Sequence, residues 1–283
     1  MIAIVESGST KSDWVFLNNN KDEIFRTETI GFNPHFIDKA TIVEELLKNK
    51  LILENKDTLE RLYFYGAGCS SPSDNKIIED GMAMAFTDAK ILVDHDLLGA
   101  AYSAYFDEPA IICILGTGSN SCYFDGKKTR EEVSSLGYVL GDYGSGSFLG
   151  KKLLRSYVEN KLTPELKEEL KRDYNVSVES ILDNIYRKPF PNRYLASFSP
   201  FIYKNRNNPY IQRMIYDSIR LFFETHIMSY PEAFSVKINF IGSISYYYQE
   251  IIEAVASHMR VKVGHIVSRP IDRLVEYHIK HIL

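Results

Sequence analysis

Three polar loops rich in glycine, serine and threonine each follow a short apolar segment of the chain. They lie at residues 6–11 (ESGSTK), at residues 116–120 (GTGSN) and at Gly242-Ser243. Glycine lets backbone N–H groups approach an anion closely, and hydroxyl side chains add donors. The third loop also opens a predicted helix, whose N-terminus favours anions or a nucleotide. One such loop is common in any protein, but three at strand ends predict a site for a phosphate chain.

Two other nucleotide-binding motifs are absent from the sequence. No G-x-x-x-x-G-K-[ST] segment occurs, which excludes a P-loop. Gly116-Thr117-Gly118 lacks the third glycine of a dinucleotide fingerprint, and a predicted strand follows it where the fingerprint needs a helix. A Rossmann-type cofactor is therefore not expected.

Asp96 lies where a buried strand ends and a helix begins. Ligands bind open α/β sheets at this edge, and a carboxylate there can accept a proton from a substrate hydroxyl during phosphoryl transfer. An aspartate that caps the helix fits the same pattern, and the two roles can coexist. His95 stands between Asp94 and Asp96, but one strand end rarely points three such side chains inward, so we do not expect zinc.

Residues 137–146 (GYVLGDYGSG) form the segment densest in glycine. Glycine at this density around one carboxylate favours a substrate loop, in which Asp142 bonds sugar hydroxyls, over a flexible loop before a helix. The run Tyr246-Tyr247-Tyr248 follows the third loop. We interpret it as helix packing rather than a platform for a nucleotide base, and leave open one ring near the adenine.

Strands that alternate with helices must position these loops. In the first half we expect strands at residues 2–5, 13–17, 23–29, 62–65 and 91–93, and helices starting at the capping box Thr41/Glu44, over 74–86, and from Asp96 to about 105. This alternation predicts parallel strands and an α/β fold.

The second half opens on the same pattern as the first. A strand at 110–115, a polar loop and a strand at 121–124 predict a duplicated architecture, with coincidence as the alternative. The region 144–228 is predicted to be helical, with a proline-rich break at 189–200 and a long helix over 209–229. A strand at 236–241, one helix from 242 to about 258, a strand at 261–266 and a helix from Pro270, with His278 and His281 on its surface, complete the chain.

The bulk composition fits a mildly acidic enzyme. The 283 residues carry a net charge of -4, which gives no reason to expect nucleic-acid or membrane partners. The three cysteines include no C-x-x-C pair, so reduced thiols are expected. We see no signal peptide and no apolar run near the roughly 20 residues that span a bilayer, and we expect a cytoplasmic protein.

Taken in order, the motifs resemble those of the BadF/BadG/BcrA/BcrD ATPase family, and within it the N-acetylglucosamine kinases of the actin/hexokinase/Hsp70 superfamily. The matching stretches are residues 6–14, 31–34, Asp96 with the small-residue helix after it, 116–120, 137–145 and 240–243. The resemblance implies two RNase H-like domains of the actin-like ATPase type with an interdomain cleft. Their expected bounds are 1–106 with 270–283, and 107–269 including a helical insertion.

The resemblance also implies roles for individual residues. Asp96 corresponds to the catalytic base that takes the proton of the sugar 6-hydroxyl, and it counts among the substrate-binding residues. The positions corresponding to ATP-binding loops are Gly8, Ser9, Thr10, Lys11, Gly116, Thr117, Gly118, Ser119, Gly242 and Ser243. The remaining sugar-binding positions are Asn33, Asn120, Gly137 and Asp142. Mg²⁺ would bridge the phosphates of ATP and be held, largely through water, by Glu6.

Two positions depart from the family pattern. Many relatives carry aspartate where Glu6 stands, and a carboxylate where Tyr143 stands. A phenol cannot accept sugar hydroxyl protons as an ionised acid does, which leaves the exact sugar open. The other branch of the family bridges an iron–sulfur cluster through cysteines, and no suitable cysteine pair is evident here.

The sequence therefore predicts a kinase that uses ATP and Mg²⁺ to phosphorylate the 6-hydroxyl of an amino sugar, N-acetylglucosamine first. The alternatives are a kinase for glucosamine, N-acetylmuramic acid or another sugar, and a non-catalytic ATP-binding sensor of the same fold. An actin-like filament protein fits less well, because the chain is short. The expected partner is a small-molecule sugar, and the family resemblance suggests a homodimer.

Overall fold

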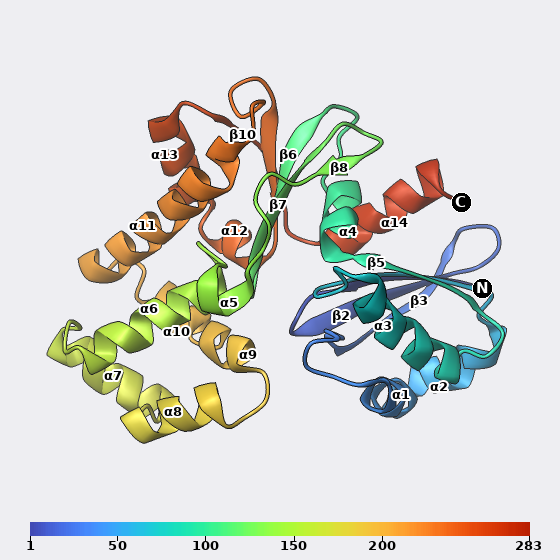
Figure 1. The fold of residues 1–283 in the computed structure, drawn as a ribbon, viewed down its shortest axis with the longest axis horizontal. Coiled ribbons are helices and arrows are strands. Elements are labelled where there is room, and N and C mark those ends of the chain that lie inside the picture. The colour runs from blue at the N-terminus through green and yellow to red at the C-terminus, as the bar shows by residue number, and fades with distance from the viewer. The chain divides into compact units, whose positions relative to one another are not determined.

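The computed structural model describes residues 1–283 and divides into two compact units. The first unit comprises Met1–Glu108, Phe124–Thr129 and Val267–Leu283, and the second comprises Pro109–Tyr123 and Arg130–Ile266. Each unit is built on one five-stranded sheet covered by helices (Figure 1). No helix combines the length and the apolar composition needed to cross a bilayer.

The sheet of the first unit is mixed, in the order β3-β2-β1-β4-β5. β1 pairs antiparallel with β2 and parallel with β4. Burial explains the central place of β1, since the side chains of Ile2-Ala3-Ile4-Val5 are all buried. The strands are β1 (Ile2–Ser7), β2 (Lys11–Leu17), β3 (Glu23–Ile30), β4 (Arg61–Gly66) and β5 (Lys90–His95).

The sheet of the second unit repeats this topology strand for strand. Its order, β10-β9-β6-β7-β8, follows from the first when each strand is replaced by its counterpart in the second half. β6 pairs parallel with β9 as β1 does with β4. The strands are β6 (Ala110–Leu115), β7 (Ser119–Phe124), β8 (Thr129–Arg130), β9 (Lys237–Ile241) and β10 (Lys262–Val267). The duplication predicted from the two loop motifs is confirmed.

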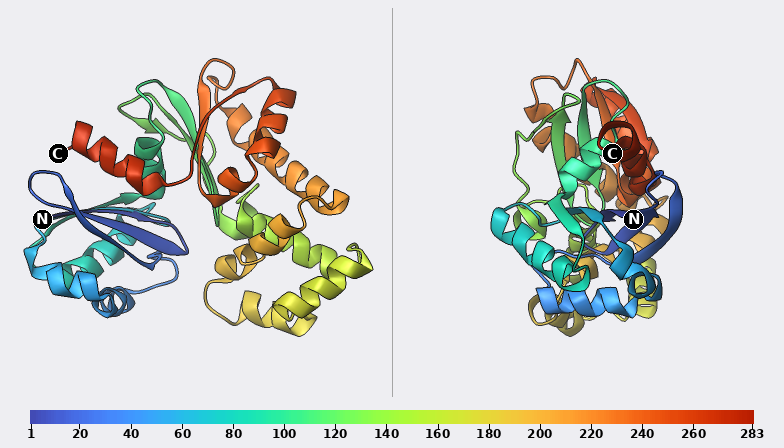
Figure 2. Two further views of the ribbon diagram at one scale, coloured as in Figure 1. Left: turned by 180° about the vertical axis from the view of Figure 1, so that it is seen from behind. Right: turned by 90° about the vertical axis from the view of Figure 1, so that its right-hand side faces the viewer.

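Helices of the first unit pack on its sheet. α4 and α14 lie beside each other (Figure 2), and Ile271 and Leu274 of α14 join the core with Ile4 of β1. The elements are α1 (Lys39–Lys48), α2 (Lys50–Asn55), the short 3-10 helix η1 (Lys56–Thr58), α3 (Pro72–Ala85), α4 (Asp96–Ser103) and α14 (Pro270–His281). The predicted start of α1 at Thr41 is wrong, because the Asp38 carboxylate caps the helix and accepts the Thr41 N–H at 2.9 Å.

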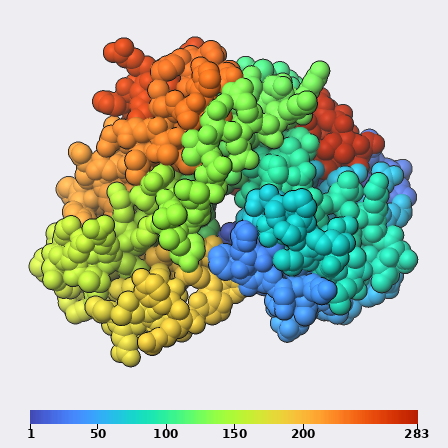
Figure 3. Space-filling model, in the orientation of Figure 1, coloured from blue at the N-terminus to red at the C-terminus, as the bar shows by residue number.

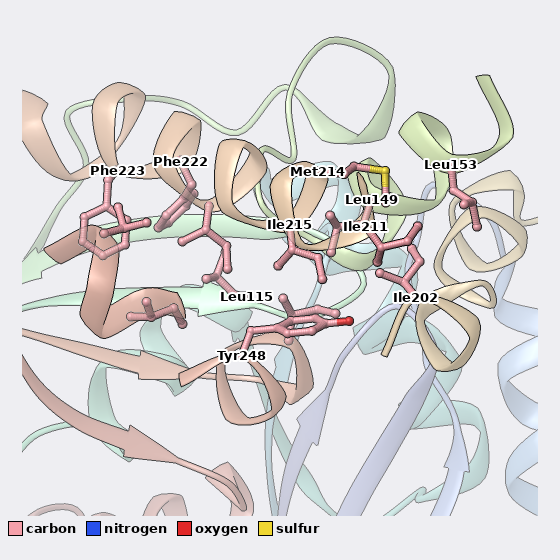
Figure 4. Packing of buried hydrophobic residues seen from close by; sticks show 14 of the residues in the cluster. Leu115, Leu149, Leu153, Ile202, Ile211, Met214, Ile215, Phe222, Phe223 and Tyr248 are labelled. Carbon is pink, nitrogen blue, oxygen red and sulfur yellow. The ribbon is translucent and has the colours of Figure 1, made fainter. Parts of the chain in front are cut away.

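Helices of the second unit enclose a larger core. Side chains of α11, among them Ile215 and Phe222, pack above Leu115 of β6 and the ring of Tyr248 (Figure 4). The elements are α5 (Gly137–Leu140), α6 (Gly146–Val158), α7 (Pro164–Tyr174), α8 (Val178–Tyr186), α9 (Pro191–Ala196), α10 (Ser199–Lys204), α11 (Pro209–Thr225), η2 (Ile227–Ser229), α12 (Ser243–Tyr247) and α13 (Gln249–Met259). In Figure 3, α7 and α8 occupy the yellow-green to yellow surface of this unit.

Three expectations for the second unit need correction. The helices are interrupted at residues 187–190, but most of the proline-rich segment is itself helical, because Pro191 and Pro200 lie in the first turns of α9 and α10, where a missing N–H costs nothing. The long helix α11 ends at Thr225, and the short 3-10 helix η2 follows it. The helix after Gly242 is divided at Tyr248, whose backbone leaves the helical region while its ring enters the core.

His278 is buried, so the prediction that it lies on the surface is wrong. Its Nε2 atom lies 2.9 Å from the hydroxyl of Tyr65, and its Nδ1 atom has no hydrogen-bond partner. Burial lowers the pKa of His278 to about 4. The spacing Ile271, Leu274, His278 places all three on one helix face, a periodicity that could have revealed the burial.

We expect His278 to make the first unit sensitive to acid. Because its pKa is lower in the folded protein than the ordinary value of 6.5, the unfolded chain binds the proton more readily. The contribution of His278 to the unfolding free energy is therefore fully present above about pH 6.5 and is lost as the pH falls towards 4. The total loss is limited to roughly 3 kcal/mol. His278→Gln, which cannot titrate, should flatten the dependence of the unfolding free energy on pH between 7 and 4.

The exposed His281 on the same helix provides the control, and His281→Gln should retain the wild-type profile. His226 of the second unit is also buried, with a pKa lowered to about 4, and should supply acid sensitivity of similar size in that unit. Denaturant titrations at several pH values measure both effects. A His278→Gln profile as steep as that of the wild type would contradict the assignment.

Candidate active site

The first polar loop joins β1 to β2 and is shorter than the sequence suggested. Ser7 still belongs to β1 and Lys11 to β2, so the turn itself comprises residues 8–10. Gly31, after β3, lies directly against it: its N–H donates to the Thr10 carbonyl oxygen at 3.0 Å. A Cβ atom on Gly31 would lie 2.1 Å from the carbonyl oxygen of Gly8. Only glycine lets the two backbone segments meet in this way.

Asn33 is brought to the same loop. Its amide nitrogen donates to Ser9 Oγ at 3.4 Å, while its Oδ1 atom accepts the N–H of His35 at 3.0 Å. Gly68, which follows β4 with φ of +83°, leaves the space that this side chain needs, since a Cβ there would lie 2.4 Å from Asn33 Oδ1. Asn33 is 6% exposed. The structure thus gathers two predicted site residues, Ser9 and Asn33, from different segments.

Carboxylates cluster beside this loop. Glu6 on β1 lies opposite Asp13 on β2, and Asp96 is the first residue of α4. Burial, and then the negative charges of Asp13 and Asp96, raise the pKa of Glu6 to about 8. Burial, and then the negative charge of Asp96, raise the pKa of the Cys69 thiol to about 12. Asp96 therefore lies among the ends of β1, β4 and β5, at the carboxyl edge of the parallel strands.

The expectation that Asp96 caps its helix is not met. The Nδ1 atom of His95 accepts the Leu98 N–H at 3.1 Å and so occupies the N-cap position. The Asp96 carboxylate is one residue inside the helix, where the dipole favours a negative charge. Because His95 caps α4, Asp96 is not needed as the N-cap of this helix.

The ammonium group of Lys11 forms ion pairs with two carboxylates of its own unit. Its ammonium lies 2.9 Å from a carboxylate oxygen of Glu28 and 3.0 Å from one of Asp13. The pKa of Lys11 is raised by these two hydrogen-bonded carboxylates in spite of its partial burial, which acts in the opposite direction. Any contact of Lys11 with a phosphate would compete with these two ion pairs.

The second polar loop, residues 116–118, rests on the N-terminus of α6. The Gly116 N–H donates to the Gly118 carbonyl at 3.0 Å and closes the turn. Two N–H groups of α6 then donate to the loop, Gly146 to the Gly116 carbonyl at 2.8 Å and Ser147 to the Thr117 carbonyl at 3.0 Å. These contacts fix the loop against the helix that follows the glycine-rich segment.

Asp142 ties the glycine-rich segment to the second loop. Its Oδ1 atom accepts the Ser119 N–H at 3.0 Å, and Ser147 Oγ lies 3.5 Å from Oδ2. A Cβ on Gly118 would lie 3.0 Å from Asp142 Oδ1, so the loop passes close to the carboxylate. Burial raises the pKa of Asp142, while the Ser119 N–H acts against that rise. The buried hydroxyl of Ser119 has no hydrogen-bond partner.

The third loop closes on the second. Gly242 has φ of +105°, and a Cβ there would lie 2.5 Å from the carbonyl oxygen of Leu115 and 3.1 Å from the Gly116 nitrogen. Ser243 is the exposed first residue of α12. Within the second unit, then, the structure brings together three separated segments that the sequence had singled out.

Asn120 and Gly137 are the remaining predicted residues of this unit. Asn120 is part of β7, and its Oδ1 atom accepts the Ser121 N–H at 2.8 Å. Gly137 begins α5 with φ of +66° and no atom near its Cβ position. Tyr143 packs edge-on against Phe148, with ring centroids 5.3 Å apart.

Two contacts of the site were not predicted. Gly31 belonged to a recognised stretch without a role of its own, and Ser147 was not singled out at all. The sequence offered only a general signal for Gly31, since glycine is common where two backbone segments approach closely. No local signal identifies Ser147, because its relation to Asp142 depends on the left-handed backbone of Asp142 (φ 58°).

Several known proteins that are similar to this chain in sequence or fold carry the names of sugar kinases. The chain is 34% identical to a Porphyromonas gingivalis protein provisionally named an N-acetylglucosamine kinase, with a TM-score of 0.90 and full coverage of both chains. A glucokinase of the ROK family from Streptomyces griseus, solved with glucose and AMPPNP, shares 13% identity over 97% of each chain with a TM-score of 0.60, which shows the fold alone.

One curated relative, an N-acetylmuramic acid/N-acetylglucosamine kinase of Clostridium acetobutylicum, is 30% identical over 152 residues. The match covers 52% of this chain and 48% of the relative, so the chain spans about half the length of the curated protein it matches. Residues 5–208 match the model of one family, and this match includes the first two polar loops and the glycine-rich segment. The chain is a member of the BadF/BadG/BcrA/BcrD ATPase family.

Proposed function

We propose that the chain is an ATP-dependent carbohydrate kinase that phosphorylates the 6-hydroxyl of an amino sugar, with N-acetylglucosamine as the acceptor. The observation that carries the proposal is the closure of Asp142 and Gly242 onto the loop at residues 116–118, which gives one unit a glycine-lined backbone cradle. Membership of an ATPase family and the names of the P. gingivalis and C. acetobutylicum proteins support the choice of reaction.

In the proposed reaction the 6-hydroxyl oxygen attacks the γ-phosphorus of ATP. Asp96 accepts the hydroxyl proton, the bond from the γ-phosphorus to the β,γ-bridging oxygen breaks, and ADP leaves with the electron pair. The loops at residues 8–10 and 116–118 hold the phosphates, with Gly242 and Ser243 beside the adenosine. Asn33, Asp142, Asn120 and Gly137 orient the sugar. Most of the rate enhancement would come from positioning and charge neutralisation.

The carboxylates of the first unit fit a hydrated Mg²⁺ ion. A pKa of about 8 keeps a proton on Glu6 at neutral pH, and a cation beside Asp13 and Asp96 would displace that proton. No three histidine, cysteine or carboxylate side chains converge to coordinate a metal directly. Glu6 would therefore hold the ion through water, as is common for Mg²⁺. When bound, the ion neutralises charge on the ATP phosphates.

N-acetylmuramic acid is the second candidate acceptor. The name of the C. acetobutylicum relative includes both sugars. The family resemblance also implies that Tyr143 stands where many members carry a carboxylate. A phenol removes a negative charge from the substrate loop. That change would ease the approach of a sugar that is itself an anion.

A coupled assay of ADP release across a panel of sugars tests the proposal. With Mg²⁺ and ATP, we expect turnover with N-acetylglucosamine and little with glucosamine or glucose, and mass spectrometry should find the phosphate on the 6-oxygen. Faster turnover with N-acetylmuramic acid would transfer the assignment to that sugar. ATP binding with no sugar-stimulated ADP release would reject the kinase and favour a non-catalytic sensor.

A further inference from the structure

A cluster of aromatic rings with one arginine lies at the junction of α10 and α12. Tyr203 of α10 and Tyr247 of α12 have ring centroids 4.9 Å apart, and Tyr246 lies 5.5 Å from Tyr247 in an edge-on arrangement. The guanidinium of Arg206 covers the ring of Tyr203 at 4.1 Å. We call Tyr203, Arg206, Tyr246 and Tyr247 the aromatic surface. All four belong to the second unit.

Two of these rings are open to solvent. Tyr246 is 48% exposed and Tyr247 is 54% exposed. The third tyrosine of the run behaves differently: Tyr248 is 3% exposed, and its ring lies in the core below α11 (Figure 4). The interpretation of the tyrosine run as helix packing is therefore correct for Tyr248 only. Neighbouring exposed aromatic rings offer flat apolar faces that suit a planar ligand.

The aromatic surface lies next to the nucleotide cradle through α12. The Tyr246 N–H donates to the carbonyl of Gly242 at 3.2 Å, so Tyr246 stands one helical turn beyond that glycine. Gly242 itself packs against Leu115 and Gly116, at the start of the second polar loop. A rise of about 1.5 Å per helical residue places the backbone of Tyr246 and Tyr247 roughly 6–8 Å along α12 from Gly242.

We propose that Tyr247, supported by Tyr203 and Arg206, stacks on the purine base of the bound nucleotide. This inference rests on the proposed function and adds to it the residue that discriminates a nucleotide from a bare polyphosphate. Stacking suits the site because every purine has a π-face, and the Arg206 guanidinium over Tyr203 holds the supporting ring in place. Tyr247 is a specificity-determining residue in this scheme and takes no part in the chemical step.

Calorimetric titration with ATP and with inorganic tripolyphosphate, both with Mg²⁺, tests the proposal. Tyr247→Ala should raise the dissociation constant for ATP by about 5- to 150-fold, the range of one base–aromatic stack. Its affinity for tripolyphosphate should stay at the wild-type value, because that ligand has no base. Tyr247→Phe keeps the ring and should bind ATP as the wild type does.

Tyr186→Ala is the matched control, since Tyr186 is a 78% exposed tyrosine on α8 of the same unit. It should leave the affinity for both ligands unchanged. Wild-type affinity of Tyr247→Ala for ATP, or an equal loss for ATP and tripolyphosphate, would overturn the stacking role while leaving the kinase assignment standing. A wild-type protein that binds no ATP would overturn the proposed function and the stacking role together.

Discussion

Replacing Asp96 by asparagine is expected to lower kcat by about 10²–10⁴-fold while the KM for the sugar stays close to the wild-type value. Removal of a general base costs this much because the hydroxyl proton then has no acceptor as the bond to phosphorus forms. Asparagine has nearly the same shape, and His95 caps the helix, so the fold should be retained. Steady-state ADP release, with the melting temperature as a check on folding, measures the effect.

Asp94 provides a neighbouring control. It lies on β5 two residues earlier, and its Oδ1 atom accepts the His95 N–H at 2.8 Å, a bond that asparagine can also accept. Asp94→Asn should therefore keep both kcat and stability. Undiminished turnover in Asp96→Asn would remove the base assignment, whereas an equal loss in both variants would indicate a general electrostatic effect of this strand end.

Nine of the ten strands were predicted, most of them from a short apolar run bounded by polar turns, whereas β8 consists of two polar residues and was missed. Ile2 to Val5 and Ala110 to Leu115 show this directly, and both strands occupy the centre of their sheets. Helix ends were harder. Asp38 and His95 cap α1 and α4, while the sequence pointed to Thr41 and Asp96. Histidine is an uncommon N-cap residue, so composition favoured the aspartate beside it.

The candidate site residues were chosen by residue type, but their contacts could not be derived from spacing. Asp142 reaches the N–H of Ser119, 23 residues away, only because its backbone adopts φ of +58° between two helices. The burial of His278 required knowledge of which helix face meets the sheet. Contacts of this kind depend on tertiary packing, which overrides the local preferences that a sequence displays.

Gly31→Ala is expected to be the most damaging single-methyl change in the first unit. The added Cβ would lie 2.1 Å from the Gly8 carbonyl oxygen and 2.8 Å from backbone atoms of Ser9 and Thr10. Backbone atoms cannot swing aside as a flexible side chain does, so the loop must move as a whole. Overpacking of this kind costs about 3 kcal/mol, which would lower the melting temperature of the unit by roughly 6–12 °C. Displacement of the loop should also weaken ATP binding.

Gly8→Ala is the matched comparison, because it adds the same methyl group to the loop that Gly31 contacts but at a position that points away from Gly31. The nearest atom to a Cβ on Gly8 is the Lys11 carbonyl oxygen at 3.7 Å, an ordinary contact. Its melting temperature should therefore stay near that of the wild type. Equal melting temperatures for the two variants would mean that the loop tolerates movement. The close approach of Gly31 would then not be what fixes the first polar loop.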